Sequence, residues 1–314
     1  MSGGVKRRRP SSFRLYALIS LMILLWSLNF TIGKIALREI EPLLLSALRT
    51  ALAALFILPV YLWKVHTEKR RLEAEGPECL PRVRQPWDRN ELRLLILLGV
   101  FGVALNQVFF VLGLGNTSVA HASVLMGMTP VQVLLLAAVR KQERITLRKL
   151  LGMIIAIGGV AWLNASPGKG ANASLVGDVC MLLASFAFAV FTVAGKSVTK
   201  RHDSITVNTF AYVCGAILLL PLIIWRGAGF DFSAVSGSAW VSLFYMAAFP
   251  SVLCYLIFYY ALTFIAASRL SAFSYVQPFL AMLLAFPLLG EPITSSAISG
   301  GALVLAGVYL TERG

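Results

Sequence analysis

The sequence predicts an all-α membrane protein whose ten transmembrane helices form two inverted five-helix repeats. Three observations predict this fold class: apolar segments of membrane-spanning length recur through the chain, Lys and Arg are concentrated in particular connections, and a set of short motifs occurs twice at constant spacing. An ordinary soluble domain is excluded, because such a domain is roughly 25% charged, whereas this chain is 13% charged and 58% hydrophobic.

Apolar segments long enough to span a membrane make up most of the chain. A helix needs about 20 apolar residues to cross a hydrocarbon layer roughly 30 Å thick, and runs of this length begin at Leu15 and recur almost to the C-terminus. Helices satisfy their own backbone hydrogen bonds inside lipid, where water is absent. We therefore predict ten spans, at residues 15–36, 43–63, 92–115, 118–139, 147–164, 175–198, 205–225, 238–262, 268–289 and 293–311.

The connections between these spans carry most of the basic residues. The longest, 64–91, combines many Lys and Arg with acidic residues and prolines, and it predicts a solvated loop. With the N-terminus in the cytoplasm, the Lys and Arg on the other side are Lys34, Arg38, Arg49, Lys169 and Arg226 out of 28 in the chain. The positive-inside rule predicts this orientation. We expect an integral protein of the bacterial inner (plasma) membrane with both termini cytoplasmic. Its predicted parts are a tail at 1–14, a first repeat at 15–164, a non-cytoplasmic linker at 165–174 and a second repeat at 175–314.

The net charge of +14 also occurs in nucleic-acid-binding proteins, but here no nucleic-acid-binding module accompanies it. We expect the lipid bilayer and a small-molecule substrate as partners and no nucleic acid, while the sequence leaves the oligomeric state open. The four cysteines are scattered and predict neither a disulfide framework nor a metal site. The sequence contains no GxxxxGK[ST], HExxH or GxSxG motif, so we predict no cofactor, no metal and no catalytic residues.

Short motifs recur at two constant spacings, which indicates an internal duplication. In a first set of matches, which share one spacing, Gly33-Lys34, Leu58-Pro59 and Trp63 recur as Gly195-Lys196, Leu220-Pro221 and Trp225. In a second set, which share a slightly shorter spacing, Ser123, Pro130, Glu143, Ile145-Thr146, Gly152 and Gly159 recur as Ser271, Pro278, Glu291, Ile293-Thr294, Gly300 and Gly307. We call the spacing from Gly33 to Gly195 the first offset and that from Pro130 to Pro278 the second offset.

Each repeated unit has five spans, so the second unit enters the membrane from the opposite face and the repeat is inverted. The first offset exceeds the second because the basic connection at 64–91 makes the first unit longer. Inverted repeats permit alternating access, although duplicated helical units also occur in scaffolds and channels.

Several of these motifs resemble a known family. Trp26-Ser27-Leu28-Asn29-Phe30 with Gly33-Lys34 is similar to the opening signature of EamA-type members of the drug/metabolite transporter superfamily. Leu48-Arg49, residues 120–130 and Gly290-Glu291-Pro292-Ile293-Thr294 resemble the same pattern. The resemblance covers nearly the whole chain. It implies ten helices in a 5+5 duplication and an exporter-like carrier for metabolites or drugs, with a central cavity between the halves. The sequence departs from the pattern at Gln142-Glu143-Arg144 and in the long connection at 64–91.

A binding site at the interface of the repeats is expected near the middle of the membrane. Amide and phenol groups at that depth should point inward, because lipid offers them no hydrogen bonds. The alternative for each is a hydrogen bond between helices, worth about 0.6 kcal/mol on average. The candidates for lining a substrate cavity are Trp26, Asn29, Asn106, Gln107, Thr129, Gln132, Phe188, Thr192, Tyr255, Tyr275 and Gln277.

Prolines and ionisable residues supply two further sets of candidates. Pro130 and Pro278 occupy equivalent positions inside predicted helices, where a proline removes a backbone donor and permits bending; a static kink is the alternative. We predict rim or gate positions for basic residues near the ends of the spans, where long side chains reach the interface: Lys34, Arg49, His121 and Lys196. The sequence places no acidic residue at mid-depth, which disfavours exchange of protons for cationic drugs on a buried carboxylate.

The sequence thus predicts a transporter, and not an enzyme, that moves small organic solutes such as amino acids, other metabolites or drugs. Transport would proceed by alternating access through a central cavity, in an exporter or a facilitator. One alternative is a membrane-embedded enzyme acting on a lipid-linked substrate, which requires acids, bases or metal ligands that converge at depth. Another is a membrane scaffold or receptor that transports nothing.

Overall fold

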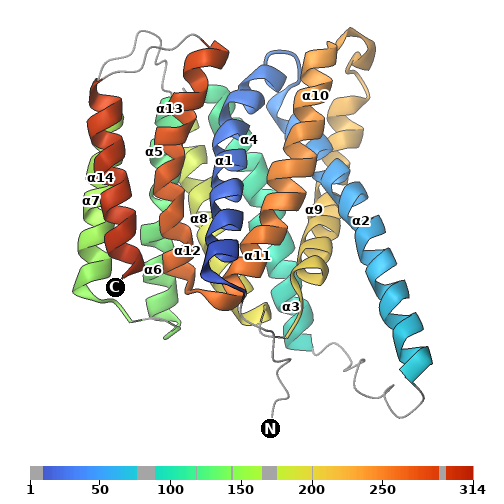
Figure 1. The fold of residues 1–314 in the computed structure, drawn as a ribbon. Helices are drawn as coiled ribbons and strands as arrows, with labels where there is room; N and C mark the ends of the chain where they lie inside the picture. The colour runs from blue at the N-terminus through green and yellow to red at the C-terminus, as the bar shows by residue number, and fades with distance from the viewer. Residues whose placement is uncertain are drawn as a thin grey trace.

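The computed structural model describes residues 10–75, 89–117, 119–142, 144–164, 175–199, 201–289 and 295–313, most of which are helical (Figure 1). The predicted linker at 165–174 lies outside the described residues. The elements in chain order are α1 Ser12–Ala36, α2 Pro42–Glu75, α3 Arg89–Leu97, η2 Leu98–Leu105, α4 Asn106–Asn116, α5 Val119–Met126, α6 Thr129–Val139, α7 Leu147–Asn164, α8 Leu175–Val198, α9 Ser204–Gly227, η3 Phe232–Ala234, α10 Gly237–Met246, η4 Ala247–Leu253, α11 Cys254–Phe264, α12 Ala267–Ala272, η5 Phe273–Tyr275, α13 Val276–Leu289 and α14 Ser295–Glu312.

These elements form ten helical segments in the described part of the chain, which confirms the predicted fold class. The third segment is α3, η2 and α4, the fourth α5 and α6, the eighth α10, η4 and α11, and the ninth α12, η5 and α13. Among the described residues, six segments are long and apolar enough to cross a membrane by length and composition alone, namely Ser12–Ala36, Pro42–Arg70, Arg89–Asn116, Leu175–Val198, Ser204–Gly227 and Gly237–Phe264. The other four are shorter or interrupted and complete the bundle.

The first and last helices meet the same face of this bundle. In Figure 1, α1 begins and α14 ends at the lower end, whereas α1 ends and α8 begins at the upper end. We call the lower end the terminal face and the upper end the far face. α8 therefore runs from the far face to the terminal face, opposite to α1, as an inverted repeat requires.

Contacts between the segments follow the duplication. α1 packs on the eighth segment, and α8, its counterpart in the second repeat, packs on the third. α2 packs on α9, and α7 packs on α14, so each of these pairs joins two equivalent helices. Figure 1 shows the pair of α7 and α14 at one side of the bundle and the pair of α2 and α9 at the other. Exchanging the two halves leaves this pattern of contacts unchanged.

The third and eighth segments each contain a π-helical stretch, at equivalent positions. When the second offset is added to the residue numbers of η2, the resulting range coincides with η4 except at its first residue. Pro250 of η4 has no backbone N–H to give to an α-helical hydrogen bond, and Gly102 stands at the same position of η2. A Cβ atom at Gly102 would lie 1.7 Å from Cδ2 of Phe191, so a residue larger than glycine does not fit beneath that ring. Such π-helical turns are frequent at functional sites.

Two equivalent ion pairs join the ends of α2 and α9. Lys64 of α2 pairs with Asp203, the N-cap of α9, near the terminal face. Arg226, near the end of α9, pairs with Glu41, which directly precedes α2, near the far face. The first offset relates Lys64 to Arg226 and also Glu41 to Asp203. Each repeat thus contributes one basic residue and one carboxylate, and an ion pair joins α2 to α9 near each face.

The predicted loop at 64–91 is partly helical, which corrects the sequence-based boundary. α2 continues to Glu75, past its predicted end at residue 63. This extension contains no Gly or Pro, and Lys69 and Glu73 form an i,i+4 ion pair of 3.7 Å, a contact that supports exposed helices. A charged composition indicates exposure to water but does not distinguish a helix from a loop. Residues 76–88 lie outside the described part of the chain.

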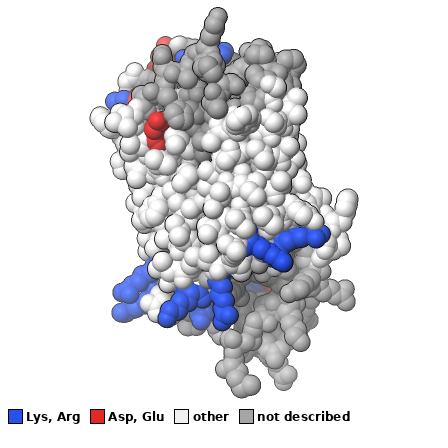
Figure 2. Space-filling view, turned by 90° about the vertical axis from the view of Figure 1, so that its left-hand side faces the viewer, with Lys and Arg blue, Asp and Glu red and all other residues white. Residues whose placement is uncertain are grey.

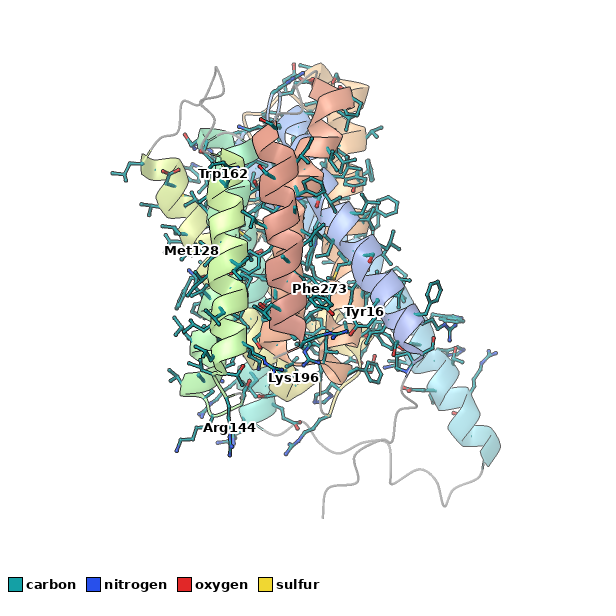
Figure 3. The ribbon with its side chains drawn as sticks, turned by 60° about the vertical axis from the view of Figure 1, so that its left-hand side comes forward. Tyr16, Met128, Arg144, Trp162, Lys196 and Phe273 are labelled. Carbon is teal, nitrogen blue, oxygen red and sulfur yellow. The ribbon has the colours of Figure 1, made fainter. Side chains whose placement is uncertain are left out.

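The two prolines predicted to bend helices stand in the first turns of helices instead. Pro130 follows the end of α5 and lies at the start of α6; Pro278 follows the 3₁₀ stretch η5 and lies in the first turn of α13. A proline is tolerated there because first-turn N–H groups have no partner within the helix. The fourth and ninth segments are thus interrupted at equivalent positions. Met128, in the first interruption, lies near mid-height in Figure 3.

Candidate functional site

A cavity of about 60 Å³ lies between the two repeats. It has room for a few water molecules, and its wall combines aromatic rings with amide, hydroxyl and guanidinium groups. The residues of the wall are Trp26, Asn29, Phe30, Arg49, Asn106, Gln107, Phe110, Met126, Thr129, Phe188, Tyr255, Ser274 and Gln277. They come from α1, α2, α4, α5, α6, α8, α11, η5 and α13, so both repeats contribute.

Eight of these wall residues are four pairs of equivalent positions. The first offset relates Trp26 to Phe188, and the second offset relates the other three pairs, which are Gln107 with Tyr255, Met126 with Ser274 and Thr129 with Gln277. The rings of Trp26 and Phe188 meet edge to face with centroids 5.6 Å apart. Equivalent residues can touch one another only close to the axis that relates the halves. The cavity therefore includes part of that axis.

Each π-helical stretch accepts a hydrogen bond from an aromatic residue of the other repeat. Trp26 Nε1 donates to the Pro250 carbonyl oxygen at 3.1 Å, and Tyr255 Oη donates to the Gly102 carbonyl oxygen, also at 3.1 Å. Gly102 and Pro250 are equivalent positions, related by the second offset. The irregular backbone of η2 and η4 thus supplies the acceptors that orient two rings of the wall.

The remaining wall residues all come from the first repeat. Asn29 and Phe30 lie one turn beyond Trp26 on α1, toward the far face, and Phe110 lies one turn beyond Gln107 on α4 in the same direction. The cavity therefore extends from the axis toward the far face. The residues equivalent to Asn29, Phe30, Arg49, Asn106 and Phe110 do not line it; these are Phe191, Thr192, Ala211, Cys254 and Phe258, each at most 1% exposed.

Aromatic residues fill the space between the cavity and the terminal face. We call Phe191, Phe258 and Tyr259 the aromatic plug; all three side chains are buried. The ring of Phe191 lies 5.0 Å from that of Tyr259 and stacks on that of Phe258 at 6.2 Å, measured between centroids. These separations lie within the range of favourable aromatic pairs. The plug closes the cavity on the side opposite to its extension.

Arg49 lies in the cavity wall and not at a rim, which corrects the prediction. Its side chain is 3% exposed, and Nε donates to Ser251 Oγ at 2.9 Å, while Ser251 Oγ donates to the Met246 carbonyl oxygen. Nη1 has no hydrogen-bond partner among the described residues, and none of the ion pairs in that part of the chain includes Arg49. The titratable side chains that face it are Tyr212, Tyr245, Cys254 and Tyr255.

Of the eleven predicted cavity residues, the wall includes Trp26, Asn29, Asn106, Gln107, Thr129, Phe188, Tyr255 and Gln277. Three others serve contacts within or between helices. Gln132 Oε1 accepts from Ser185 Oγ at 3.0 Å, Thr192 Oγ1 donates to the carbonyl oxygen one turn earlier in its own helix, and Tyr275 is buried in an apolar cluster with α7 and α14. The alternative weighed from the sequence, a hydrogen bond between helices, therefore describes Gln132 but not Thr192, which bonds within its own helix, or Tyr275, whose hydroxyl has no partner among the described residues.

The lysines predicted at a rim or gate are bound to helix ends. Lys34 Nζ donates to the Thr117 carbonyl oxygen at 2.7 Å, after the end of α4. Lys196 Nζ donates to the Ile265 carbonyl oxygen at 2.5 Å, after the end of α11, and Figure 3 shows Lys196 toward the lower end of the bundle. The second offset relates Thr117 to Ile265. Cations stabilise helix C-termini in this way. The side chain of His121, the remaining rim candidate, lies outside those that the structure describes.

Sequence reasoning missed four residues of the wall: Phe30, Phe110, Met126 and Ser274. An apolar residue in a membrane helix has the same chemistry whether it faces lipid, a neighbouring helix or a cavity, so Phe30 and Phe110 carry no signal. Met126 and Ser274 precede Thr129 and Gln277 by three positions, and positions three apart share a helix face. A search one helical turn before each predicted polar residue locates both.

In the described part of the chain, ten helical segments form two equivalent halves around a partly polar cavity on their common axis, an arrangement typical of polytopic membrane transporters. The chain belongs to the EamA-like transporter family, whose family model matches residues 14–165 and again residues 175–313. This result confirms the resemblance noted in the sequence. It also agrees with the duplication, because each half by itself matches the family.

Individual proteins of known sequence agree with this assignment. An uncharacterized transporter of Archaeoglobus fulgidus is 31% identical over 95% of this chain and 98% of its own length. A probable terminal-alkyne amino-acid exporter of Streptantibioticus cattleyicolor is 32% identical over 74% of this chain and 76% of its own length. A protein of known crystal structure has the same fold, with a TM-score of 0.70 and 20% sequence identity, and the alignment covers 96% of both chains.

Proposed function

We propose that this EamA-family protein moves small organic solutes across the bilayer by alternating access through the central cavity. The observation that supports this proposal best is the position of the cavity, which begins at the axis relating the repeats and extends to one side of it. In an inverted repeat the two halves can exchange conformations, so a state that is open to one side has a counterpart that is open to the other.

The counterpart state follows from the equivalent residues. After the exchange, Phe191 and Phe258 of the aromatic plug would line the cavity on the terminal side, and Asn29 and Phe110 would close it on the far side. The π-helical stretches and the interruptions at Met128 and η5 are the positions where the segments could bend, since their backbone is already irregular. Pro130 and Pro278 directly follow these interruptions and are proposed as parts of the hinges.

The distribution of charge supports an orientation for this cycle. Lys and Arg gather at the lower end of the surface in Figure 2, and Arg144 lies at the same end in Figure 3. By the positive-inside rule the terminal face is cytoplasmic, so the observed cavity extends toward the outside of the cell. Because one relative is a probable exporter of an amino acid, we infer that this protein exports or equilibrates amino acids or related metabolites.

The competing function, catalysis on a lipid-linked substrate, finds less support in this cavity. The described residues of its wall offer one guanidinium, three amides in the first repeat, a fourth amide at Gln277, two hydroxyls and the Tyr255 phenol, and include no carboxylate, imidazole or thiol. A hydrolytic or transfer reaction needs groups that give and take protons in a convergent arrangement. The wall is better suited to holding a solute than to transforming one.

Proteoliposomes containing the purified chain test the proposal. A panel of labelled amino acids is offered with and without a pH gradient, and at least one of them should cross the membrane faster than in protein-free liposomes. Trp26→Ala removes a ring from the centre of the cavity and should reduce this rate. Trp63→Ala is the matched control, because Trp63 is 71% exposed on the outside of the bundle. Rates equal to leakage for every solute would contradict the transport proposal.

A further inference from the structure

Three buried polar atoms of the cavity wall lack hydrogen-bond partners within the described part of the chain. They are Arg49 Nη1, Asn29 Oδ1 and Thr129 Oγ1, and their side chains are 3%, 4% and 1% exposed. The first is a charged donor, the second an acceptor, and the third can act as either. A buried polar group without a partner is costly, so polar groups that share one cavity and have no partner there are available to a molecule that enters it.

The charge of Arg49 has no counterpart among the described residues that surround it. A guanidinium stays protonated in proteins, and a lone charge at membrane depth is a functional-site signal. Three other basic residues of the bundle have partners: Lys64 and Arg226 pair with carboxylates, and Lys34 donates to a carbonyl oxygen. Of these four described residues, Arg49 alone faces a cavity with an uncommitted nitrogen.

On the basis of the proposed transport function, we propose that Arg49 binds a carboxylate of the transported solute, while Asn29 accepts a hydrogen bond from an ammonium group of the same molecule. The substrate class is then the zwitterionic amino acids. A guanidinium presents parallel N–H groups that match the two oxygens of a carboxylate. The observed cavity has room for only a few water molecules, so its wall must widen when an amino acid binds; the rings of Trp26, Phe188 and Tyr255 then supply an apolar surface for the rest of the solute.

The same arrangement disfavours cationic solutes that carry no carboxylate. A cation in this cavity would meet the positive charge of Arg49 at low dielectric, where like charges repel strongly. The wall offers no carboxylate among its described residues to offset that repulsion. Of the solutes expected from the sequence, the site therefore selects amino acids over cationic drugs.

Ser251 is a positioning residue for this site. It lies in η4 of the second repeat and holds Nε of Arg49, which belongs to the first repeat. The guanidinium is thereby oriented across the interface between the halves. Since the position equivalent to Arg49 is Ala211, the second repeat provides no second cation there, and the carboxylate site belongs to the state whose cavity extends toward the far face.

Paired solutes test the inference without altering the protein. Wild-type proteoliposomes are offered labelled L-leucine, L-phenylalanine and L-threonine and, for each, the amide in which a neutral group replaces the carboxylate. We expect transport of the acids and little transport of the amides. Chloride and inorganic phosphate are added as competitors, because either anion could also occupy a guanidinium site. Amides carried as well as acids, or competition by the inorganic anions but not by other amino acids, would refute the carboxylate site while leaving the transport proposal intact.

Variants of Arg49 supply the second arm of this experiment. Arg49→Gln should raise the half-saturating concentration of the acids by about 10- to 100-fold, the value of a hydrogen bond to a charged group, and Arg49→Lys should have a smaller effect. Arg38→Gln is the matched control, since Arg38 is exposed after the end of α1. Thermal unfolding verifies that each variant is folded. An Arg49→Gln protein that is folded and retains wild-type discrimination between acids and amides would overturn the inference; no transport of any compound by the wild type would instead overturn the proposed function.

Discussion

Gln107 and Tyr255 occupy the same position in the two repeats, and their side chains meet, with Gln107 Nε2 donating to Tyr255 Oη at 3.5 Å. Two copies of one position come together only where the axis between the halves passes. This contact, like that of Trp26 with Phe188, therefore belongs to the part of the molecule that an exchange of conformations moves least. The solute site is expected to stay at this depth while the segments on either side open and close.

Alternating access predicts opposite accessibility for two equivalent positions, 106 and 254. Asn106 lines the observed cavity, whereas Cys254 is fully buried. In a background with Cys79→Ser, Cys180→Ser and Cys214→Ser, Cys254 should react with a membrane-impermeant thiol reagent added at the terminal face. The rate should rise under an imposed solute gradient that favours the counterpart state.

The matched variant adds Asn106→Cys to a background in which Cys254→Ala also removes the native thiol. It should react from the far face, without any solute. Vesicles of both orientations separate the two directions of attack. Reaction of Cys254 from the far face, or of both positions from one face, would be incompatible with an exchange between the halves.

Gly102 should tolerate no larger residue, because its Cα packs against the ring of Phe191. Gly102→Ala should destabilise the protein by about 1–3 kcal/mol, the usual range for overpacking, and combination with Phe191→Leu should recover part of the loss. Thermal unfolding in detergent measures both effects. The control is Gly158→Ala on α7, where nothing lies within 4 Å of the added Cβ; there alanine should be neutral or stabilising through its higher helix propensity. Equal effects at both glycines would show that the contact with Phe191 is unimportant.

The ion pair of Asp203 with Lys64 predicts a dependence of stability on pH. Desolvation alone would raise the pKa of Asp203, but hydrogen bonds from Lys64 and Thr206 outweigh it and hold the pKa below its usual value. A carboxyl with a lowered pKa stabilises the folded state above its unfolded pKa of about 3.9, and this contribution is lost as pH falls through the folded pKa.

Asp203→Asn keeps a side chain that can cap α9 while removing the charge. At pH 7 the variant should be less stable by under about 1 kcal/mol, because a third of the side chain is exposed and the pair is screened by water. The difference in Tm between variant and wild type should shrink as the pH is lowered below 4. A difference that stays constant from pH 7 to pH 3 would mean that the charge of Asp203 contributes nothing.

Much of the fold is predictable because membrane helices are recognisable by length and composition, and because Gly-Lys and Pro motifs are present in both halves. The same offsets place Trp26 and Gln107 near the axis, where the cavity begins. The helix at 64–75 escapes prediction, since charged residues fit an exposed helix as well as a loop. The sequence locates Pro130 and Pro278 at irregular points of their segments, but it does not distinguish a break before each proline from a kink.

The environment of Arg49 is beyond the reach of the sequence. This residue lies two turns after the start of α2, a depth at which a long basic side chain in an isolated helix reaches the membrane surface. Packing of α2 against η4 directs it inward instead, where Ser251 holds it. Such a contact between the second and eighth segments depends on tertiary structure. Phe30 and Phe110 escape prediction for a related reason, because only the assembled bundle separates a cavity face from a lipid face.

Arg49 and Ala211 occupy equivalent positions but differ in charge, and this difference has a consequence for how proteins of this architecture can diversify. A duplicated gene begins with two identical halves, and two identical halves are sufficient for alternating access. Preference for a solute needs a difference between the halves, and here one charged residue on one side provides it. A chain assembled from two copies of the second half would keep the aromatic residues near the axis, but its cavity would have no charged residue at the position of Arg49. Chemical preference can therefore change through substitutions in one half while the other preserves the movement.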